Sequence, residues 1–213
     1  QPLTITEESE AMNELPKDWA ELDDEEIYAK LDQLDKSFKQ IKEEGIDDQA
    51  IHAFEILSKK ERFNNRIASN KSTPSHVLLN IINELTNNGK QEPANDSYKY
   101  VRNCAVRNLF GINPSYGKEP SGKEQCSTEM LEKLSTHGDD YIRCNVAESS
   151  NVTEAILLRL LDDKDDYVKG IASNKLLPTK WRSVINEYKF DELKTMLNEE
   201  DINQNVYDLL SLS

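Results

Sequence analysis

The sequence predicts an all-α protein built as a stack of short helix pairs, and three observations support this fold class. A short segment occurs four times, as FNNRIASN at 63–70, YVRNCAVR at 100–107, IRCNVAES at 142–149 and YVKGIASN at 167–174. A polar break and a second stretch rich in Leu and Ile follow several of these copies. Of the 213 residues 31% are charged and only seven are glycine, which suits an elongated helical protein better than a compact α/β enzyme.

Each copy of the segment has the pattern of a short helix with one buried face. The copies are aligned on an alanine: Ala68, Ala105, Ala147 and Ala172. A smaller apolar residue comes directly before it: Ile67, Cys104, Val146 and Ile171. A large apolar residue comes five positions before it: Phe63, Tyr100, Ile142 and Tyr167. Because an α-helix has 3.6 residues per turn, these positions share one side, and we expect all of them to be buried.

The region before the repeats, residues 1–52, is predicted to be an acidic helical extension. Its first 20 residues have no clean period and are expected to begin as a flexible tail. One amphipathic helix of about six turns is predicted to start at the acidic run 23–26, to carry apolar residues from Ile27 to Ile41, and to stop at Gly45. A second helix is predicted from Asp47 to about Lys60, since acidic residues favour helix starts.

The repeat array is predicted to span 53–186, with capping helices in 187–213 at Phe190–Leu197 and Ile202–Leu212. A second helix is expected after each polar break, at 77–82, 128–134, 156–161 and 181–185, with starts near Pro74, Thr153 and Pro178. The alanines are 37, 42 and 25 residues apart, so we take the last interval as the basic unit. The longer intervals then contain loop insertions at Thr86–Ser97 and Leu109–Ser127.

Charge and cysteine content narrow the possible functions. Residues 1–61 carry 18 acidic and 7 basic side chains, a net charge of −11, whereas the other 152 residues have a net charge of −3. This balance speaks against nucleic-acid binding, which normally needs a basic face. Three scattered cysteines suggest reduced thiols in a cytoplasmic protein, and no apolar run is long enough to span a membrane.

No pattern in the sequence indicates a catalytic, cofactor or metal site. His52, His76 and His137 are far apart in the chain and have no neighbouring cysteine pair. The acidic pairs Asp139–Asp140, Asp162–Asp163 and Asp165–Asp166 recur where helices start, and capping explains them without general acid–base chemistry. We therefore expect a protein without enzymatic activity.

Two copies carry a resemblance to a known repeat. The segments DDYIRCNVA at 139–147 and DDYVKGIASN at 165–174 resemble the variant leucine-rich repeat, which belongs to the wider HEAT and armadillo-like group. The resemblance covers about 53–186 and implies a right-handed superhelix of helix pairs that displays a protein-binding surface. We expect the protein to be bacterial and cytoplasmic. The sequence departs from the family in two ways: the Ile-Arg pair of the third copy is one residue out of phase, and no cysteine cluster resembles the iron–sulfur extension of some members.

Two sets of residues are candidates for binding a partner protein. The first is a polar ladder predicted opposite the apolar faces, with Tyr116 in the long loop: Asn65, Arg66, Asn70, Arg102, Asn103, Arg107, Lys169 and Asn174. The second is the acidic helix start: Asp23, Asp24, Glu25 and Glu26. The alternative for the ladder is a solvated face whose Asn residues cap turns and whose Arg residues pair with aspartates of the next unit. The alternative for the acidic helix is a solvated helix whose carboxylates contact only water.

From these patterns we expect a protein–protein interaction module that binds another protein, with a basic partner as one option. The first alternative is an immunity or inhibitor protein that masks a basic toxin or nuclease through residues 7–48. The second is an enzyme, since HEAT-like folds also resemble the DNA glycosylases that remove alkylated purines. The near-neutral array lacks the basic, Trp- and Arg-rich groove that such an enzyme uses.

Overall fold

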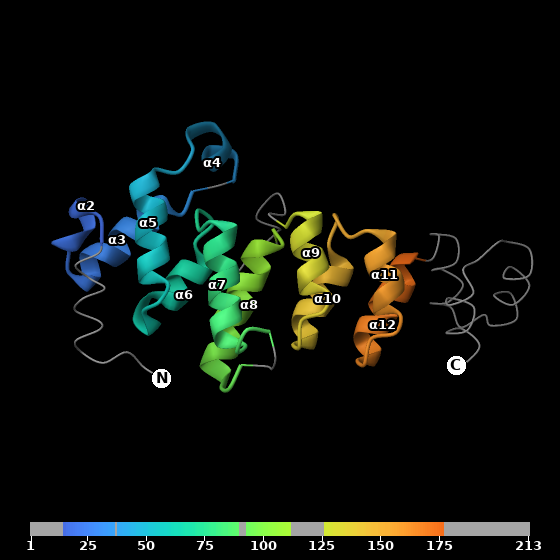
Figure 1. Ribbon diagram of the computed structural model, residues 1–213. Coiled ribbons are helices and arrows are strands. Elements are labelled where there is room, and N and C mark those ends of the chain that lie inside the picture. Colours follow the sequence, from blue (N-terminus) through green and yellow to red (C-terminus); the bar gives the residue numbers. More distant parts are fainter. Residues whose placement is uncertain (1–14, 37, 90–92, 112–125, 177–213) are drawn as a thin grey trace, which may run out of the picture. The chain divides into compact units, whose positions relative to one another are not determined.

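All of the regular structure in the described part of the chain is helical. The computed structural model describes residues 15–36, 38–89, 93–111 and 126–176, and this part contains helices and no strand (Figure 1). The helices are α2 Lys17–Ala20, α3 Asp24–Leu34, α4 Phe38–Glu44, α5 Asp48–Leu57, α6 Glu61–Ser69, α7 Ser75–Leu85, α8 Asp96–Leu109, α9 Thr128–Leu134, α10 Asp140–Glu148, α11 Glu154–Leu160 and α12 Asp166–Leu176. The all-α prediction is confirmed for these residues, whereas the right-handed superhelix stays a prediction.

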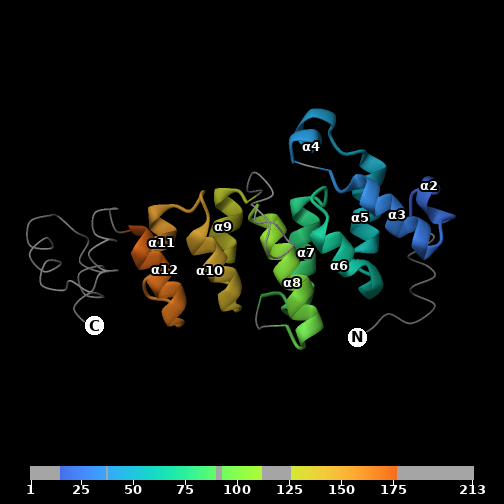
Figure 2. The same ribbon diagram turned by 180° about the vertical axis from the view of Figure 1, so that it is seen from behind.

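The chain divides into two compact units, Gln1–Cys126 and Ser127–Ser213. In the first unit α8 packs against both α6 and α7, and α6 also contacts α3 and α5. In the second unit α12 packs against α10 and α11, and α9 contacts α10. Figure 2 shows the same helices from behind. The predicted domain limits at 52/53 and 186/187 stay predictions. The expected helices at 181–185, Phe190–Leu197 and Ile202–Leu212, together with Pro178 and Tyr116, lie outside the described residues.

Side-chain caps explain where most helices start. The Asp23 carboxylate accepts from the Glu26 backbone N–H (2.9 Å) and the Glu26 carboxylate accepts from the Asp23 N–H (3.0 Å), which forms a capping box. Asp47 Oδ1 accepts from Gln49 N at the start of α5, and the predicted cap Thr153 accepts from Ile156 N at the start of α11. These bonds satisfy N–H groups that have no acceptor inside the helix.

The four repeat copies form α6, α8, α10 and α12, and their aligned alanines are all fully buried. The large residue five positions earlier is buried in α6 (Phe63) and α10 (Ile142), as predicted. The same prediction is wrong for α8 and α12, where Tyr100 is 48% exposed and Tyr167 is 69% exposed. In these two helices the next residue, Val101 or Val168, is buried instead.

The register of these helices follows from helix geometry. One residue turns an α-helix by about 100°, so a core that takes the valine leaves the preceding tyrosine facing water. The helices can therefore be aligned on their first large buried residue, which is Val101 in α8, Ile142 in α10 and Val168 in α12. In this alignment Tyr100, Tyr141 and Tyr167 occupy the same position.

The prediction of a single helix from the acidic run 23–26 to Gly45 is wrong, since the chain forms α3 and α4 with a break after Leu34. The loop after α6 supplies the reason. Ser72 Oγ donates to the Leu34 carbonyl, and Asp35 Oδ1 accepts from Lys71 N at 2.8 Å. Because these groups bond to a neighbouring segment, α3 ends although the apolar periodicity continues.

A glycine pair provides a test of the helix assignments. Gly170 lies inside α12, is exposed, and would meet no atom within 4 Å if it carried a Cβ. We expect Gly170→Ala to raise the free energy of unfolding by about 0.5–1 kcal/mol, because alanine loses less backbone entropy in a helix. Gly45 also has room for a Cβ but has a φ of +74°. Gly45→Ala should therefore lower stability by about 1–2 kcal/mol. Urea denaturation measures both, and changes of the same sign would contradict the assignments.

Candidate functional site

The solvent side of the four repeat helices carries a repeated set of exposed side chains. Three positions spaced i, i+3 and i+7 lie on one face of each helix. We call them the exposed stripe: Arg62, Asn65 and Ser69 on α6; Tyr100, Asn103 and Arg107 on α8; Tyr141, Cys144 and Glu148 on α10; Tyr167, Gly170 and Asn174 on α12. Every member is exposed or half-buried. In each of these helices, the three stripe positions are therefore side chains that another molecule can reach.

The predicted ladder overlaps this stripe only in part. Asn65, Asn103, Arg107 and Asn174 belong to it, and the exposed Arg66 and half-buried Lys169 lie next to it in sequence. The prediction that Asn70 and Arg102 face solvent is wrong, since both are buried. Arg102 directly follows the buried Val101, so the one-residue shift of α8 turns it inward. Sequence reasoning also missed the tyrosines of the stripe, which it had placed in the core or at unit boundaries.

The buried polar side chains connect neighbouring repeats. Asn70 Nδ2 donates to the Leu31 carbonyl of α3 at 2.7 Å. Asn108 Nδ2, in α8, donates to the carbonyls of Ala68 (3.1 Å) and Asn70 (2.7 Å) at the end of α6. In the second unit Lys175 Nζ donates to the carbonyls of Glu148 (2.7 Å) and Ser149 at the end of α10. We call these contacts the cross-repeat bonds. They satisfy carbonyl groups that have no donor within their own helix.

The acidic helix α3 bonds to the first repeat helix. Asp24 pairs with Arg62 (2.9 Å) and Asp32 pairs with Arg66 (3.3 Å), and the Tyr28 hydroxyl donates to the Arg62 carbonyl (2.5 Å). Exposed pairs of this kind contribute little stability each. They do neutralise part of the acidic helix and part of the ladder. Of the acidic candidates, Asp23 and Glu26 form the cap of α3 and Asp24 bonds to Arg62, whereas Glu25 is exposed.

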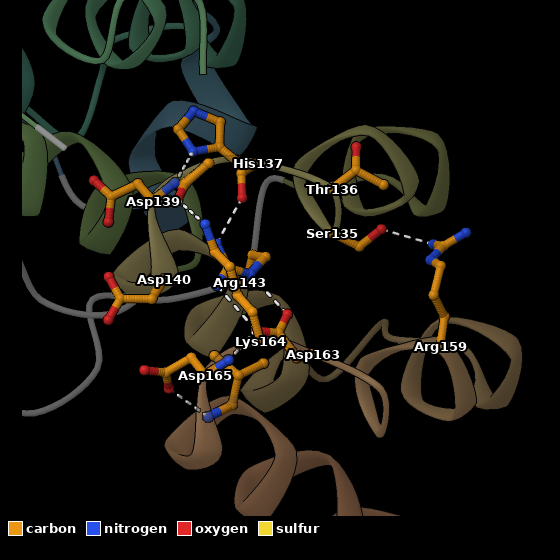
Figure 3. Close-up of polar contacts among 12 residues, drawn as sticks. Ser135, Thr136, His137, Asp139, Asp140, Arg143, Arg159, Asp163, Lys164 and Asp165 are labelled. Carbon is orange, nitrogen blue, oxygen red and sulfur yellow. Dashed lines mark hydrogen bonds and ion pairs between the residues drawn. The ribbon is translucent and has the colours of Figure 1, made fainter. Parts of the chain in front are cut away.

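A buried arginine joins three segments of the second unit (Figure 3). Arg143 of α10 donates through Nε and Nη2 to the two carboxylate oxygens of Asp163, at 2.7 and 2.9 Å. Its Nη1 donates to the His137 carbonyl at 2.7 Å. Asp163 Oδ1 also accepts from the Asp165 N–H at 2.9 Å. Only 4% of the Arg143 side chain and 6% of the Asp163 side chain are exposed. This cluster links the loop before α10 to the loop before α12.

The pKa values in the cluster follow from these bonds. Burial alone would raise the pKa of Asp163, but the Arg143 hydrogen bond and the Asp165 N–H outweigh it, so the net pKa is lowered. The bond to Asp163 raises the pKa of Arg143 against the effect of burial. Both groups are therefore charged at neutral pH, and their role is structural.

The recurring aspartates act as helix caps. Asp139 Oδ1 accepts from Tyr141 N at 3.0 Å. Asp165 Oδ1 accepts from the backbone N–H groups of Tyr167 and Val168, both at 3.0 Å. The Arg143–Asp163 pair joins an arginine of α10 to an aspartate of the loop before α12. It is a pair of the kind expected when the arginine of one unit bonds to an aspartate of the next. The capping explanation is confirmed for Asp139 and Asp165, whereas Asp163 serves as the partner of Arg143.

The cysteines do not suit nucleophilic chemistry. Cys104 and Cys126 are buried. Burial, followed by the negative charges of Asp140, Asp165 and Glu148, raises the pKa of the half-buried Cys144 to about 12. A thiol with such a pKa stays protonated at neutral pH and is a poor nucleophile.

Two histidines that are distant in sequence share one carboxylate. His76 Nε2 of α7 lies 2.7 Å from Glu55 Oε1, and His52 Nδ1 of α5 lies 3.5 Å from Glu55 Oε2. The hydrogen bond with His76 is the main cause of the lowered pKa of Glu55. All three side chains are exposed enough to be solvated. Within the described ranges, no group of three His, Cys, Asp or Glu residues has the geometry to hold a metal ion.

None of the helices in the described segments is long and apolar enough to cross a membrane. Comparisons with protein-family models, with curated proteins and with solved structures find no match to this chain. We therefore infer the function from the stripe, the cross-repeat bonds and the cluster around Arg143 and Asp163.

A substitution of Arg143 tests whether the buried pair is structural. We expect Arg143→Met to lower the free energy of unfolding by about 3–5 kcal/mol, because the Asp163 carboxylate stays buried without its cation. The double variant Arg143→Met/Asp163→Leu should lose less than Arg143→Met alone. The matched control is Arg159→Met, which breaks the exposed Arg159–Glu132 pair (2.8 Å) and should cost at most about 1 kcal/mol. Equal losses in Arg143→Met and Arg159→Met, measured in urea, would refute the structural role.

The lowered pKa of Asp163 predicts how stability depends on pH. A carboxyl whose folded pKa is depressed contributes stability above its unfolded pKa and loses it as the pH falls through the folded pKa. The stability difference between the protein and Asp163→Asn should therefore be full at pH 7 and shrink below the ordinary aspartate value of 3.8. Urea midpoints between pH 2.5 and pH 7 measure this difference. A difference that grows as the pH falls would contradict the assignment.

Proposed function

We propose that this protein is a non-enzymatic helical-repeat module that binds another protein through the exposed stripe. The observation that carries the proposal is the repetition itself: the same three helix positions stay exposed or half-buried in α6, α8, α10 and α12. Positions that face the neighbouring repeats are filled by apolar side chains and by the cross-repeat bonds. In this proposal the helix pairs form a right-handed superhelix of the HEAT and armadillo-like kind, in a reducing compartment such as the cytoplasm that suits three free cysteines.

The bonding of the charged groups supports binding rather than catalysis. Asp163, Asp139 and Asp165 are occupied by the Arg143 pair or by helix caps. The thiol of Cys144 is held protonated. General acid–base or nucleophilic catalysis needs groups tuned towards neutral pH and aimed at a substrate, whereas the pKa values of Asp163 and Cys144 are shifted away from neutral pH.

The two alternatives are less well supported by the same contacts. A partner that recognises the acidic helix has fewer charges to use, because Asp23 and Glu26 form a cap and Asp24 pairs with Arg62. A nucleic-acid enzyme of the glycosylase kind would need a basic groove, and Arg62 and Arg66 are already neutralised by Asp24 and Asp32. The stripe remains the surface best suited to a protein.

Site-specific photo-crosslinking tests the proposal. A photoreactive phenylalanine analogue is placed at Asn65 or Asn174 of the stripe, and at the exposed Asn80 of α7 as a matched control. We expect a discrete protein adduct from one or both stripe positions in a lysate of the source organism, and none from Asn80. Adducts of equal yield at all three positions, or no adduct at the stripe, would contradict the proposed function.

A further inference from the structure

The stripe of the second unit carries exposed aromatic rings on adjacent helices. Tyr167 is 69% exposed, and Tyr141 occupies the equivalent position of α10 and is half-buried. The helices α10 and α12 pack against each other, and each tyrosine lies two residues after the capping aspartate of its helix. A single exposed aromatic residue needs no explanation. Two at the same repeat position form a surface on which a partner side chain can lie.

Negative charge surrounds these rings. Asp140 directly precedes Tyr141, Asp166 directly precedes Tyr167, and Glu148 ends the stripe on α10. Residues 127–176 contain ten acidic and six basic side chains, a net charge of −4. Of the basic ones, Arg143 and Arg159 are bonded to Asp163 and Glu132. Lys169 pairs with Asp166 at 2.6 Å, but the Asp166 side chain is 95% exposed, and an exposed pair of this kind is weak enough for a partner cation to replace Lys169. Burial is the main cause of the raised pKa of Cys144 in the stripe, and the nearby carboxylates of Asp140, Asp165 and Glu148 raise it further.

Gly170 is a position without a side chain in the part of the stripe on α12, and we call the space beside it the open place. Gly170 lies three residues after Tyr167 and four before Asn174, inside α12, where a glycine weakens a helix relative to alanine. A Cβ at this position would meet nothing within 4 Å, so packing within the described chain does not require a glycine. A helix face without a side chain at this point permits close approach of a partner backbone.

We propose that the face formed by Tyr141, Tyr167 and Gly170, with Asp140 and Asp166 beside the rings, docks a segment of a partner protein that carries lysine or arginine. A guanidinium or ammonium group lies over the face of a tyrosine ring and pairs with the adjacent carboxylate. The inference rests on the proposed function and names the chemistry of its partner.

The spacing of packed helices suggests which segment fits. Neighbouring helix axes are about 8–10 Å apart. A chain in the polyproline II conformation has three residues per turn and a rise of about 3.1 Å per residue, so every third side chain recurs on one face at about 9 Å. Cationic residues three positions apart would therefore reach Tyr141 and Tyr167 in succession.

A peptide-binding experiment with the full chain tests this inference. The probe is a fluorescein-labelled 12-residue peptide with arginine at every third position and proline or alanine elsewhere, measured by fluorescence anisotropy. We expect binding that Tyr167→Ala weakens by about tenfold, as for the loss of a cation–π contact. Tyr100→Ala is the matched control at the equivalent position of α8, and it should change the affinity less than about twofold. A peptide with glutamate in place of arginine should not bind.

A second variant guards against an indirect effect of the tyrosine. Gly170→Leu is compatible with a helix and fills the open place, so it should weaken peptide binding severalfold while the circular dichroism spectrum stays unchanged. No binding of the arginine peptide, or equal losses in Tyr167→Ala and Tyr100→Ala, would overturn the inference. If the stripe still crosslinks to a protein at Asn65 in that case, the proposed function stands and only the partner class is wrong.

Discussion

The cross-repeat bonds are the constraint on which the stacking of the repeat helices depends. The last carbonyls of a helix have no donor in their own helix, and a buried carbonyl without a donor is costly. Asn70, Asn108 and Lys175 supply the donors from the following repeat. Apolar burial is non-directional and gives most of the energy, whereas these bonds are satisfied in one placement of the two helices. In the second unit, Arg143 adds a further tie through Asp163 and the His137 carbonyl.

Much of the helical fold was predictable because local rules decide it. The alanine repeat located α6, α8, α10 and α12, and capping chemistry located the start of α11 at Thr153. The errors arose where contacts between distant segments override the local pattern. The apolar periodicity continues beyond Leu34, but the bonds of Leu34 and Asp35 to the loop after α6 end the helix there. Similarly, aligning the copies on alanine hid a one-residue shift, because valine and tyrosine are both acceptable core residues in a pattern of apolar positions.

The candidate surface was predictable only in part, for a related reason. Asn65, Asn103, Arg107 and Asn174 were found because they lie opposite the apolar face of their helices. A polar side chain at a helix end is different, since Asn70 can either face water or bond to the preceding helix, and only the neighbour decides. The pairing of Glu55 with His76 depends in the same way on α5 and α7 being neighbours, which no spacing in the sequence reveals.

The helix α3 has a consequence for any shortened version of this protein. Ile27 and Leu31 are fully buried, and Tyr28 contacts the Phe63 ring of α6 at 5.1 Å between centroids. This helix therefore covers the apolar side of α6 that faces it. A fragment that starts after residue 36 would expose the apolar side of α6 to water. The Asn70 amide would also lose its acceptor, the Leu31 carbonyl. An exposed apolar surface of this kind favours aggregation, so we expect the fragment to self-associate or precipitate.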